Sequence, residues 1–200
     1  MEEKISFPSG PLLLEGLYAP GADWRGAVIC HPHPMYGGDL RNPVVGAIAA
    51  AYRCRGYATL RFNFRGTGGS QGRFDDGRGE QADVRAAAAW AAEMGLQSID
   101  LAGYSFGAWV NALAGASFSS SERMVMVSPP VAFLDFSSIG SLPRLHLVLT
   151  GEYDEIAPAE DIRRALRIWN PSARFEVVPG ADHFYSGCLP RLEALLHECL

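Results

Sequence analysis

Short apolar runs alternate with longer segments of helical periodicity along the 200 residues of this chain. The runs predict strands at residues 4–7, 12–19, 27–31, 58–63, 99–104, 124–128, 145–150 and 174–178. The periodic segments predict helices at residues 42–55, 78–93, 106–117, 159–169 and 189–199. This alternation indicates an α/β fold, in which helices flank a mostly parallel sheet. The first two runs lie close together, so we expect them to form an antiparallel hairpin at one edge of the sheet.

The composition is that of a folded chain, and we expect residues 1–200 to form a single domain. Apolar residues make up 48% of the chain and charged residues 20%, which excludes a disordered protein. The net charge is −5, and the 17 basic residues, of which only Lys4 is a lysine, are scattered. No basic stripe could follow a phosphate backbone, so we expect no nucleic-acid partner.

The sequence also bears on where the protein works. Apolar stretches are interrupted well before the roughly 18 residues that a membrane span needs, so we expect no membrane insertion. The first ten residues are charged and lack the apolar core of a secretory signal. The four cysteines form no CxxC pair, which is typical of reduced thiols. We therefore expect a cytoplasmic protein.

A serine with flanking glycines stands where a predicted strand meets a predicted helix, in Gly103-Tyr104-Ser105-Phe106-Gly107. This G-x-S-x-G pattern, in this context, is typical of a tight turn that exposes a nucleophilic serine at the end of a strand. The N-terminus of the helix would aim its N–H groups at the same point. The pattern alone is weak, and the alternative is a glycine-rich packing turn with an inert serine.

A nucleophilic serine needs a base, and the base needs an acid to orient it. His183 lies in a loop after the last predicted strand and is the candidate base. His146 falls within a predicted buried strand, and His197 lies near the end of the last helix, so structural roles are expected for both. Asp154 follows the strand at 145–150, which brings it to the same sheet edge as Ser105, and it is the candidate acid.

Three other carboxylates lie near these positions. Glu152 and Glu155 are close to Asp154 in sequence but are expected to point elsewhere. Asp182 adjoins the candidate base, and we expect it to cap the turn there. The alternative role of Asp154 itself is a loop carboxylate or a cap for the helix that follows Pro158.

The segment after the strand at 27–31 contains two histidines between prolines, His31-Pro32-His33-Pro34, followed by Gly37-Gly38. Prolines lack an N–H group, so the N–H of His33 is left as a donor between them. We expect this N–H and that of Phe106 to form an oxyanion hole. Two histidines with a nearby aspartate could also suggest a metal, but no further ligand stands at suitable spacing, so no metal site is expected.

A second glycine-rich segment, residues 61–72, follows another predicted strand. It matches neither the G-x-G-x-x-G pattern nor the Walker pattern of phosphate-binding loops. We interpret it as a structured loop that packs beside the site. Arg65 is expected to act as a structural hydrogen-bond donor, and anion binding is the alternative.

Taken together, these motifs resemble those of the α/β-hydrolase superfamily along essentially the whole chain. The resemblance rests on His31-Pro32-His33-Pro34, Asn63-Phe64-Arg65-Gly66, the serine motif, Gly151-Glu152-Tyr153-Asp154 and Gly180-Ala181-Asp182-His183. Within the superfamily the chain is similar to a small bacterial subgroup of lidless carboxylesterase-like proteins, related more distantly to dienelactone hydrolases. The resemblance implies an eight-stranded, mostly parallel sheet, a triad of Ser105, Asp154 and His183, and activity on carboxylic esters.

Two departures narrow this expectation. Many superfamily members carry a lid domain after the strand that follows the serine helix, but here only residues 128–143 separate that strand from the next. We therefore expect no lid and an open site. Dienelactone hydrolases use a cysteine where this chain has Ser105, which argues against that reaction.

The sequence thus predicts a serine hydrolase that cleaves small-molecule esters of small acyl groups through an acyl-enzyme, without a cofactor. Candidate pocket residues, each equally plausible as ordinary core, are Met35, Tyr36, Ile156, Phe184 and Tyr185. The alternatives are a thioesterase or a peptidase with the same triad, or a non-catalytic binding protein on a hydrolase scaffold. The physiological substrate and the oligomeric state are left open by the sequence.

Overall fold

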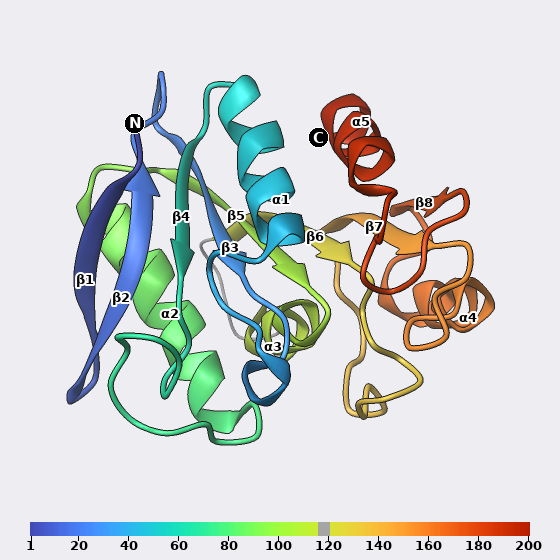
Figure 1. The fold of residues 1–200 in the computed structure, drawn as a ribbon, viewed down its shortest axis with the longest axis horizontal. Helices are drawn as coiled ribbons and strands as arrows, with labels where there is room; N and C mark the ends of the chain where they lie inside the picture. The colour runs from blue at the N-terminus through green and yellow to red at the C-terminus, as the bar shows by residue number, and fades with distance from the viewer. Residues whose placement is uncertain (116–120) are drawn as a thin grey trace.

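A computed structural model describes residues 1–115 and 121–200 of the chain (Figure 1). Eight strands form one sheet in the order β1-β2-β4-β3-β5-β6-β7-β8, and the predicted eight-stranded, mostly parallel sheet is confirmed. The strands are β1 Glu3–Ser9, β2 Leu12–Ala19, β3 Arg25–Cys30, β4 Ala58–Phe62, β5 Ser98–Tyr104, β6 Ser121–Val127, β7 Leu145–Gly151 and β8 Arg174–Val178. The hairpin of β1 and β2 forms one edge, as expected. β2 also pairs antiparallel with β4, and all other neighbours are parallel.

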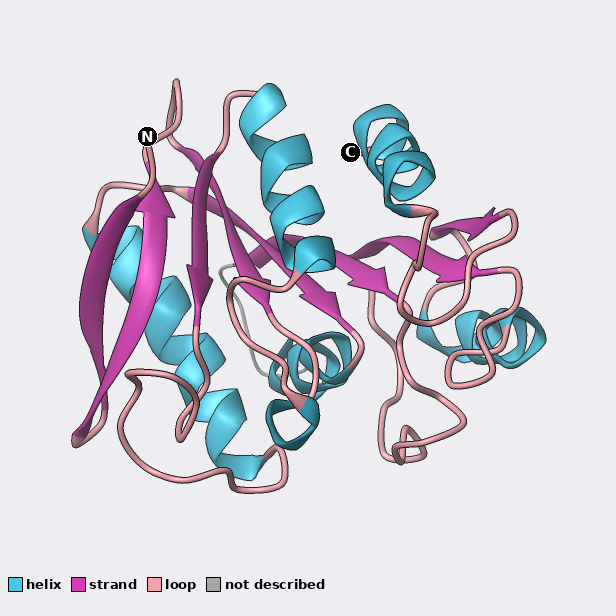
Figure 2. Ribbon diagram, in the orientation of Figure 1, coloured by secondary structure: helices cyan, strands magenta, loops and turns pink. Residues whose placement is uncertain are grey.

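Helices cover both faces of the sheet (Figure 2). The helices are α1 Pro43–Cys54, α2 Arg78–Glu93, α3 Phe106–Gly115, α4 Ala159–Trp169, α5 Leu189–Cys199 and the short 3₁₀ helix η1 Pro34–Tyr36. Helices α1 and α5 share a core with one face of the strands, and α2, α3 and α4 pack on the other face. Within β3, for example, Ile29 faces α1 and Val28 faces α2. Strands buried on both sides read as continuous apolar runs, which explains why their sequences do not alternate.

The observed ends of the strands differ from the predicted ones by a few residues, with local reasons. β3 stops at Cys30, because His31 precedes a proline and leaves the ladder. β6 stops at Val127, because Ser128 adopts a positive φ of 47°. The helix predicted over residues 106–117 is described as far as Gly115, and its predicted end at Ser117 lies outside the described residues.

The segment from 128 to 144, which joins β6 to β7, is described throughout and consists of turns and irregular structure. Seventeen residues of this kind do not form a separate layer, so the expectation of a fold without a lid is confirmed. This connection lies at the edge of the sheet where β3, β5 and β7 end (Figure 1). In the described residues, none of the helices has the length and apolarity needed to cross a membrane.

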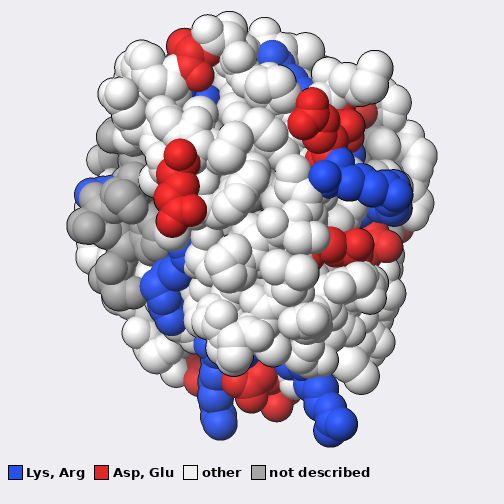
Figure 3. All heavy atoms as spheres, turned by 90° about the vertical axis from the view of Figure 1, so that its left-hand side faces the viewer, with Lys and Arg blue, Asp and Glu red and all other residues white. Residues whose placement is uncertain are grey.

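Charged side chains are interspersed on the face of the molecule that carries the β1–β2 edge. Figure 3 shows basic and acidic groups side by side there, with uncharged surface between them. Several are joined in ion pairs, such as the pair between Arg61 and Glu2. Ion pairs at or near the protein surface contribute little to stability, so the architecture rests mainly on the two apolar layers.

Candidate active site

Ser105 occupies the tight turn between β5 and α3. Its φ of 53° lies in the left-handed region, which is strained for a residue with a side chain. A hydrogen bond from the Ser105 N–H to Val127 O, at 2.9 Å, stabilises this backbone conformation. The flanking glycines are required by crowding. A Cβ at Gly103 would lie 2.5 Å from the carbonyl carbon of Gly107, and one at Gly107 would lie 2.4 Å from Cys30 O.

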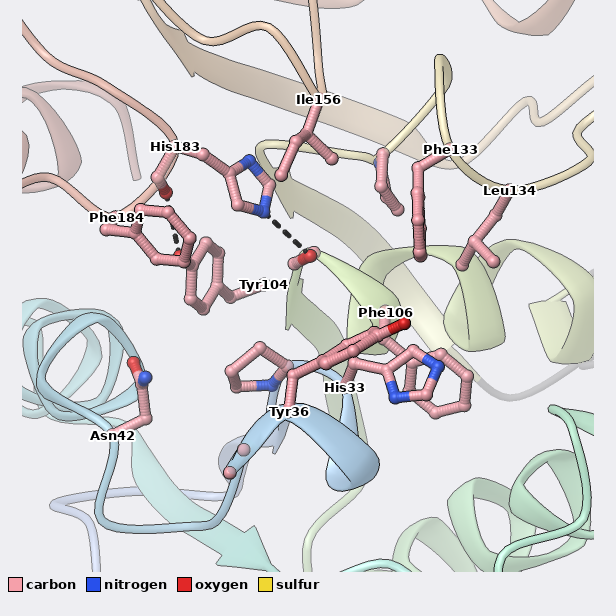
Figure 4. Close-up of a pocket in the computed structure, with 15 residues that line it drawn as sticks. His33, Tyr36, Asn42, Tyr104, Phe106, Phe133, Leu134, Ile156, His183 and Phe184 are labelled. Atoms are coloured by element: carbon pink, nitrogen blue, oxygen red, sulfur yellow. Dashed lines mark hydrogen bonds between the residues drawn. The ribbon is translucent and has the colours of Figure 1, made fainter.

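A continuous line of hydrogen bonds runs from Ser105 through His183 to Asp154 (Figure 4 shows the first of them). Ser105 Oγ lies 2.9 Å from His183 Nε2, and His183 Nδ1 lies 2.9 Å from each carboxylate oxygen of Asp154. All three residues are buried, with at most 7% of their surface exposed. The structure therefore brings together the three side chains that the sequence predicts as a triad, in the order and spacing that nucleophilic catalysis needs.

Asp154 has several partners besides His183. Its Oδ1 accepts hydrogen bonds from the N–H groups of Ile156 and Ala157, at 3.0 and 2.7 Å, and Thr150 Oγ1 donates to Oδ2 at 3.3 Å. Burial by itself raises the pKa of Asp154, but the interactions of the carboxylate with His183, together with its other hydrogen bonds, outweigh burial and hold that pKa below its ordinary value. Asp154 thus holds the turn at residues 154–157 together with its contact to His183, and it does not cap α4, whose N-cap residue is Pro158.

The loop that carries His183 is held from two sides. Tyr104, within the serine motif, donates its hydroxyl to His183 O at 2.7 Å. Asp182 accepts hydrogen bonds from the N–H groups of Phe184 and Ser186, as expected for a turn cap. The imidazole is therefore positioned by the backbone on either side of it.

The loop after β3 brings two N–H groups to the same place. His33 follows Pro32 and caps η1, and Phe106 begins α3. No acceptor in residues 1–115 or 121–200 is found for the N–H of either residue. Two unpaired N–H donors beside a serine are suited to hold a developing oxyanion. Their assignment as the oxyanion hole stays a prediction.

The side chain of His33 is wedged among aromatic rings. Its centroid lies 4.8 Å from those of Tyr36 and Phe106 and 5.0 Å from that of Phe74. Its Nδ1 accepts a hydrogen bond from the N–H of Met35, at 3.2 Å. Burial lowers the pKa of His33, which favours the neutral ring, and because Nδ1 accepts a hydrogen bond, the proton of the neutral ring lies on Nε2.

Ser105 and His183 open onto a cavity of about 430 Å³. The residues lining it are mostly apolar or aromatic: Pro32, His33, Tyr36, Gly37, Gly38, Asn42, Tyr104, Ser105, Phe106, Pro130, Phe133, Leu134, Ile156, His183 and Phe184. Within the described part of the chain, none of the lining residues is Asp, Glu, Lys or Arg. A cavity of this size and polarity suits a neutral small molecule.

Three of the five predicted pocket residues, Tyr36, Ile156 and Phe184, line this cavity. The prediction is wrong for the other two. Met35 is 68% exposed and lies outside the lining, because the η1 turn directs successive residues away from one another. Tyr185 is 1% exposed and belongs to the core beneath α5, where its hydroxyl pairs with Ser128 Oγ at 2.8 Å.

Sequence reasoning missed the lining residues of the β6–β7 connection and of the start of α1. No periodicity or motif in the sequence marks Pro130, Phe133 and Leu134 as lining residues. Their segment is distinguished in the sequence only by its short length. Asn42 had a signal, because an Asn before a proline and an apolar run is typical of a helix cap. Tyr104 lies within the serine motif itself, in the variable position before the serine.

The histidines and the arginine for which alternatives were considered have structural partners. His31 is buried, its Nε2 accepts from the Phe64 N–H at 3.0 Å, and its Nδ1 lies 2.7 Å from Pro32 O. Arg65 makes a two-point contact with Asp83, at 2.7 and 3.0 Å, as expected of a structural donor. Among the described residues, no three His, Cys, Asp or Glu side chains gather as metal ligands would.

Comparison with known proteins agrees with this geometry. An α/β serine hydrolase homologue from Coxiella burnetii is 34% identical and superposes with a TM-score of 0.92 over 99% of this chain and 97% of its own. A lidless α/β serine hydrolase from Xanthomonas campestris is 32% identical, with a TM-score of 0.88 over 98% of this chain and 92% of its own. An uncharacterized protein of Rickettsia prowazekii is 35% identical over 184 residues, which cover 86% of this chain and 77% of that protein.

Fold and relatives therefore define an α/β-hydrolase, and the superfamily inferred from the motifs is confirmed. The family described as X-Pro dipeptidyl-peptidase (S15 family) matches residues 15–176. The chain belongs to this family.

Proposed function

We propose that this protein is a serine hydrolase that cleaves carboxylic esters of small acyl groups, with Ser105 as nucleophile. The single observation that carries the proposal is the hydrogen-bonded line of Ser105, His183 and Asp154 at the wall of an uncharged cavity. Nucleophilic catalysis by serine requires these three roles in contact. The two unpaired N–H groups of His33 and Phe106 supply the fourth, stabilisation of negative charge on the carbonyl oxygen.

In the first step, His183 Nε2 takes the proton of Ser105 Oγ as that oxygen bonds to the ester carbonyl carbon. The carbonyl oxygen gains the negative charge, next to the His33 and Phe106 N–H groups. His183 then gives the proton to the leaving alcohol oxygen as its bond to the carbonyl carbon breaks, and the acyl group remains on Ser105. A water molecule then attacks the carbonyl carbon of the acyl-enzyme while His183 takes its proton. His183 returns this proton to Ser105 Oγ as the bond to the acyl group breaks, and the carboxylic acid is released. Asp154 remains ionised and stabilises the imidazolium.

The charge of the cavity favours an ester over the peptide that the family name suggests. A dipeptidyl-peptidase cuts close to the charged amino terminus of a peptide, and a buried ammonium needs an acidic partner. The described residues that line the cavity offer no carboxylate. A neutral ester needs none, and a thioester would fit on the same grounds.

The test is hydrolysis of p-nitrophenyl acetate by the purified protein. We expect Ser105→Ala to lower kcat by at least about 10⁴-fold, because the nucleophile is lost, with little change in Tm. Ser186→Ala is the matched control, since Ser186 is exposed and outside the cavity, and it should retain activity. Full activity of Ser105→Ala, or faster cleavage of an X-Pro-p-nitroanilide than of the ester, would contradict the proposal.

A further inference from the structure

The labelled side chains that line the cavity form two groups, which we call its two arms (Figure 4). One arm holds His183, whose ring lies 5.6 Å from that of Tyr104 and 5.5 Å from that of Phe184 between centroids. The other arm is bounded by Phe106, Phe133 and Leu134, together with the ring of His33. Figure 4 shows these two groups of side chains on opposite sides of the dashed hydrogen bond that His183 makes with the serine hydroxyl.

The proposed function, on which this inference rests, assigns each arm a part of the ester. His183 must give its proton to the leaving alcohol, so the alcohol has to lie on the His183 side. The oxygen of the carbonyl turns to the His33 and Phe106 N–H groups. The acyl chain takes the remaining direction, into the arm bounded by Phe106, Phe133 and Leu134.

Asn42 stands in the cavity wall on the His183 side, at the end of this alcohol arm (Figure 4). Its Oδ1 accepts a hydrogen bond from the Val44 N–H at 2.9 Å and so caps helix α1. The backbone of Asn42 is fixed as well, because its carbonyl oxygen accepts from Gly46 N and its N–H donates to Asp39 O. The residue is half-buried and rigidly held.

The cap decides which end of the Asn42 amide is available to a ligand. The bond from the Val44 N–H orients Oδ1 toward the helix end, so the Nδ2 group is the end of the amide turned away from it, and this group can only donate. Among residues 1–115 and 121–200, no acceptor for Nδ2 is found. The alcohol arm therefore ends in a fixed, neutral donor, whereas the acyl arm is lined by rings and aliphatic groups.

We propose that Asn42 is a specificity-determining residue whose Nδ2 donates a hydrogen bond to an oxygen on the leaving alcohol. The preferred substrates are then esters of small alcohols that carry a second, uncharged oxygen, as an ether or a hydroxyl group. A purely aliphatic alcohol leaves the amide unpaired when it displaces water, and an unpaired donor is unfavourable. A charged leaving group finds no Asp, Glu, Lys or Arg side chain among the described residues that line the cavity.

The test compares two acetates of equal length, 2-methoxyethyl acetate and n-butyl acetate, which differ by an ether oxygen in place of a methylene group. We expect the wild-type protein to have the higher kcat/KM on the methoxyethyl ester. Asn42→Asp retains the cap but replaces the donor with a carboxylate, and Asn42→Ser retains the cap with a side chain too short to reach. Both should lower the ratio of the two kcat/KM values by about 3- to 10-fold.

A matched variant in the other arm sharpens the result. Leu134→Ala should change the preference between acetate and butyrate esters but leave the methoxyethyl-to-butyl ratio as in the wild type. Equal kcat/KM of the wild type on both acetates, or a preference that survives in both Asn42 variants, would overturn the inference while the esterase proposal stands. Absence of hydrolysis of either acetate by the wild-type protein would contradict the proposed function itself.

Discussion

Two loops follow the neighbouring parallel strands β3 and β4 and end at the same edge of the sheet, yet they differ in what they offer a ligand. The cavity loop, residues 31–42, contributes six of the lining residues. The support loop, residues 63–72, contributes none. Both are rich in glycine, so glycine content alone does not distinguish a binding loop from a packing loop.

The difference lies in where the polar groups are used. In the support loop, Asn63 Nδ2 and the Gly69 N–H both donate to Glu15, and Ser70 Oγ donates to Asn63 O. Thr67 Oγ1 is an exception, since it is buried without a partner in the described residues. In the cavity loop, by contrast, the His33 N–H and the Asn42 Nδ2 group have no acceptor among residues 1–115 and 121–200, and both residues line the cavity. Hydrogen-bond donors without a partner beside a cavity are available to a ligand, whereas donors that are already paired stabilise the loop itself.

The largest effect that separates the two loops is expected from Gly38→Ala. A Cβ there would lie 2.2 Å from Pro32 O and 2.8 Å from His33 O, so the backbone that presents the His33 N–H must move. Loss of one oxyanion donor lowers kcat by about 10²–10³-fold, and we expect a loss of this size in ester hydrolysis.

The matched variant in the support loop is Gly69→Ala. Its Cβ would lie 2.7 Å from Glu15 Oε2, which belongs to a side chain that can turn aside. We expect a decrease of about 1–2 kcal/mol in the free energy of unfolding, and kcat within a few-fold of wild type. If Gly69→Ala lowered kcat as much as Gly38→Ala, the contrast between the loops would be wrong.

A pH-dependent effect on stability is expected at His31, which contacts both loops. Its Nδ1 is paired with Pro32 O, and its Nε2 accepts a hydrogen bond from the Phe64 N–H. A second proton on the ring would have to bind Nε2, where it would face the Phe64 N–H group. Burial lowers the pKa of His31 to about 4, whereas an unfolded histidine titrates near about 6.5. Between these pH values the unfolded chain binds more protons. The contribution of neutral His31 to the free energy of unfolding is therefore complete above about pH 6.5 and is lost as the pH falls to about 4.

Urea unfolding at a series of pH values measures this contribution. A difference of 2.5 pKa units corresponds to about 3 kcal/mol, which wild type should lose between pH 6.5 and 4 in excess of His31→Gln. The glutamine variant keeps one acceptor and one donor but does not titrate. If the free energies of unfolding of the two proteins changed in parallel with pH, His31 would not be the group whose titration lowers the stability.

The order of the elements and the triad positions could be predicted because both follow from chain direction. Parallel strands end at one edge, so Ser105, Asp154 and His183, each just after a strand, had to come near one another. The helix at Arg78–Glu93 matched its prediction at both ends, because Gly77 and Gly95 bracket its apolar face.

The lining of the cavity could not be predicted, because it depends on tertiary contacts in loops. Tyr185 follows the exposed Phe184 by one residue but turns into the core, where Ser128 supplies a partner for its hydroxyl. Phe133 enters the cavity wall through a turn in which its N–H bonds to Pro130 O, and its ring packs against Tyr36. Adjacent residues thus point to opposite sides, and sequence proximity to a catalytic position does not reveal which.

The central claim is that Ser105 is an activated nucleophile in the folded protein, and a fluorophosphonate probe tests it most directly. Intact-mass and peptide mass spectrometry should find a single phosphonyl adduct on Ser105 of the folded wild type. Ser105→Ala should remain unlabelled because it has no nucleophile at this position. Wild type unfolded in urea should also remain unlabelled, because Ser105 has then lost its contacts with His183 and, through it, with Asp154. A folded wild-type protein that forms no adduct on Ser105, or one labelled equally when unfolded, would contradict the account.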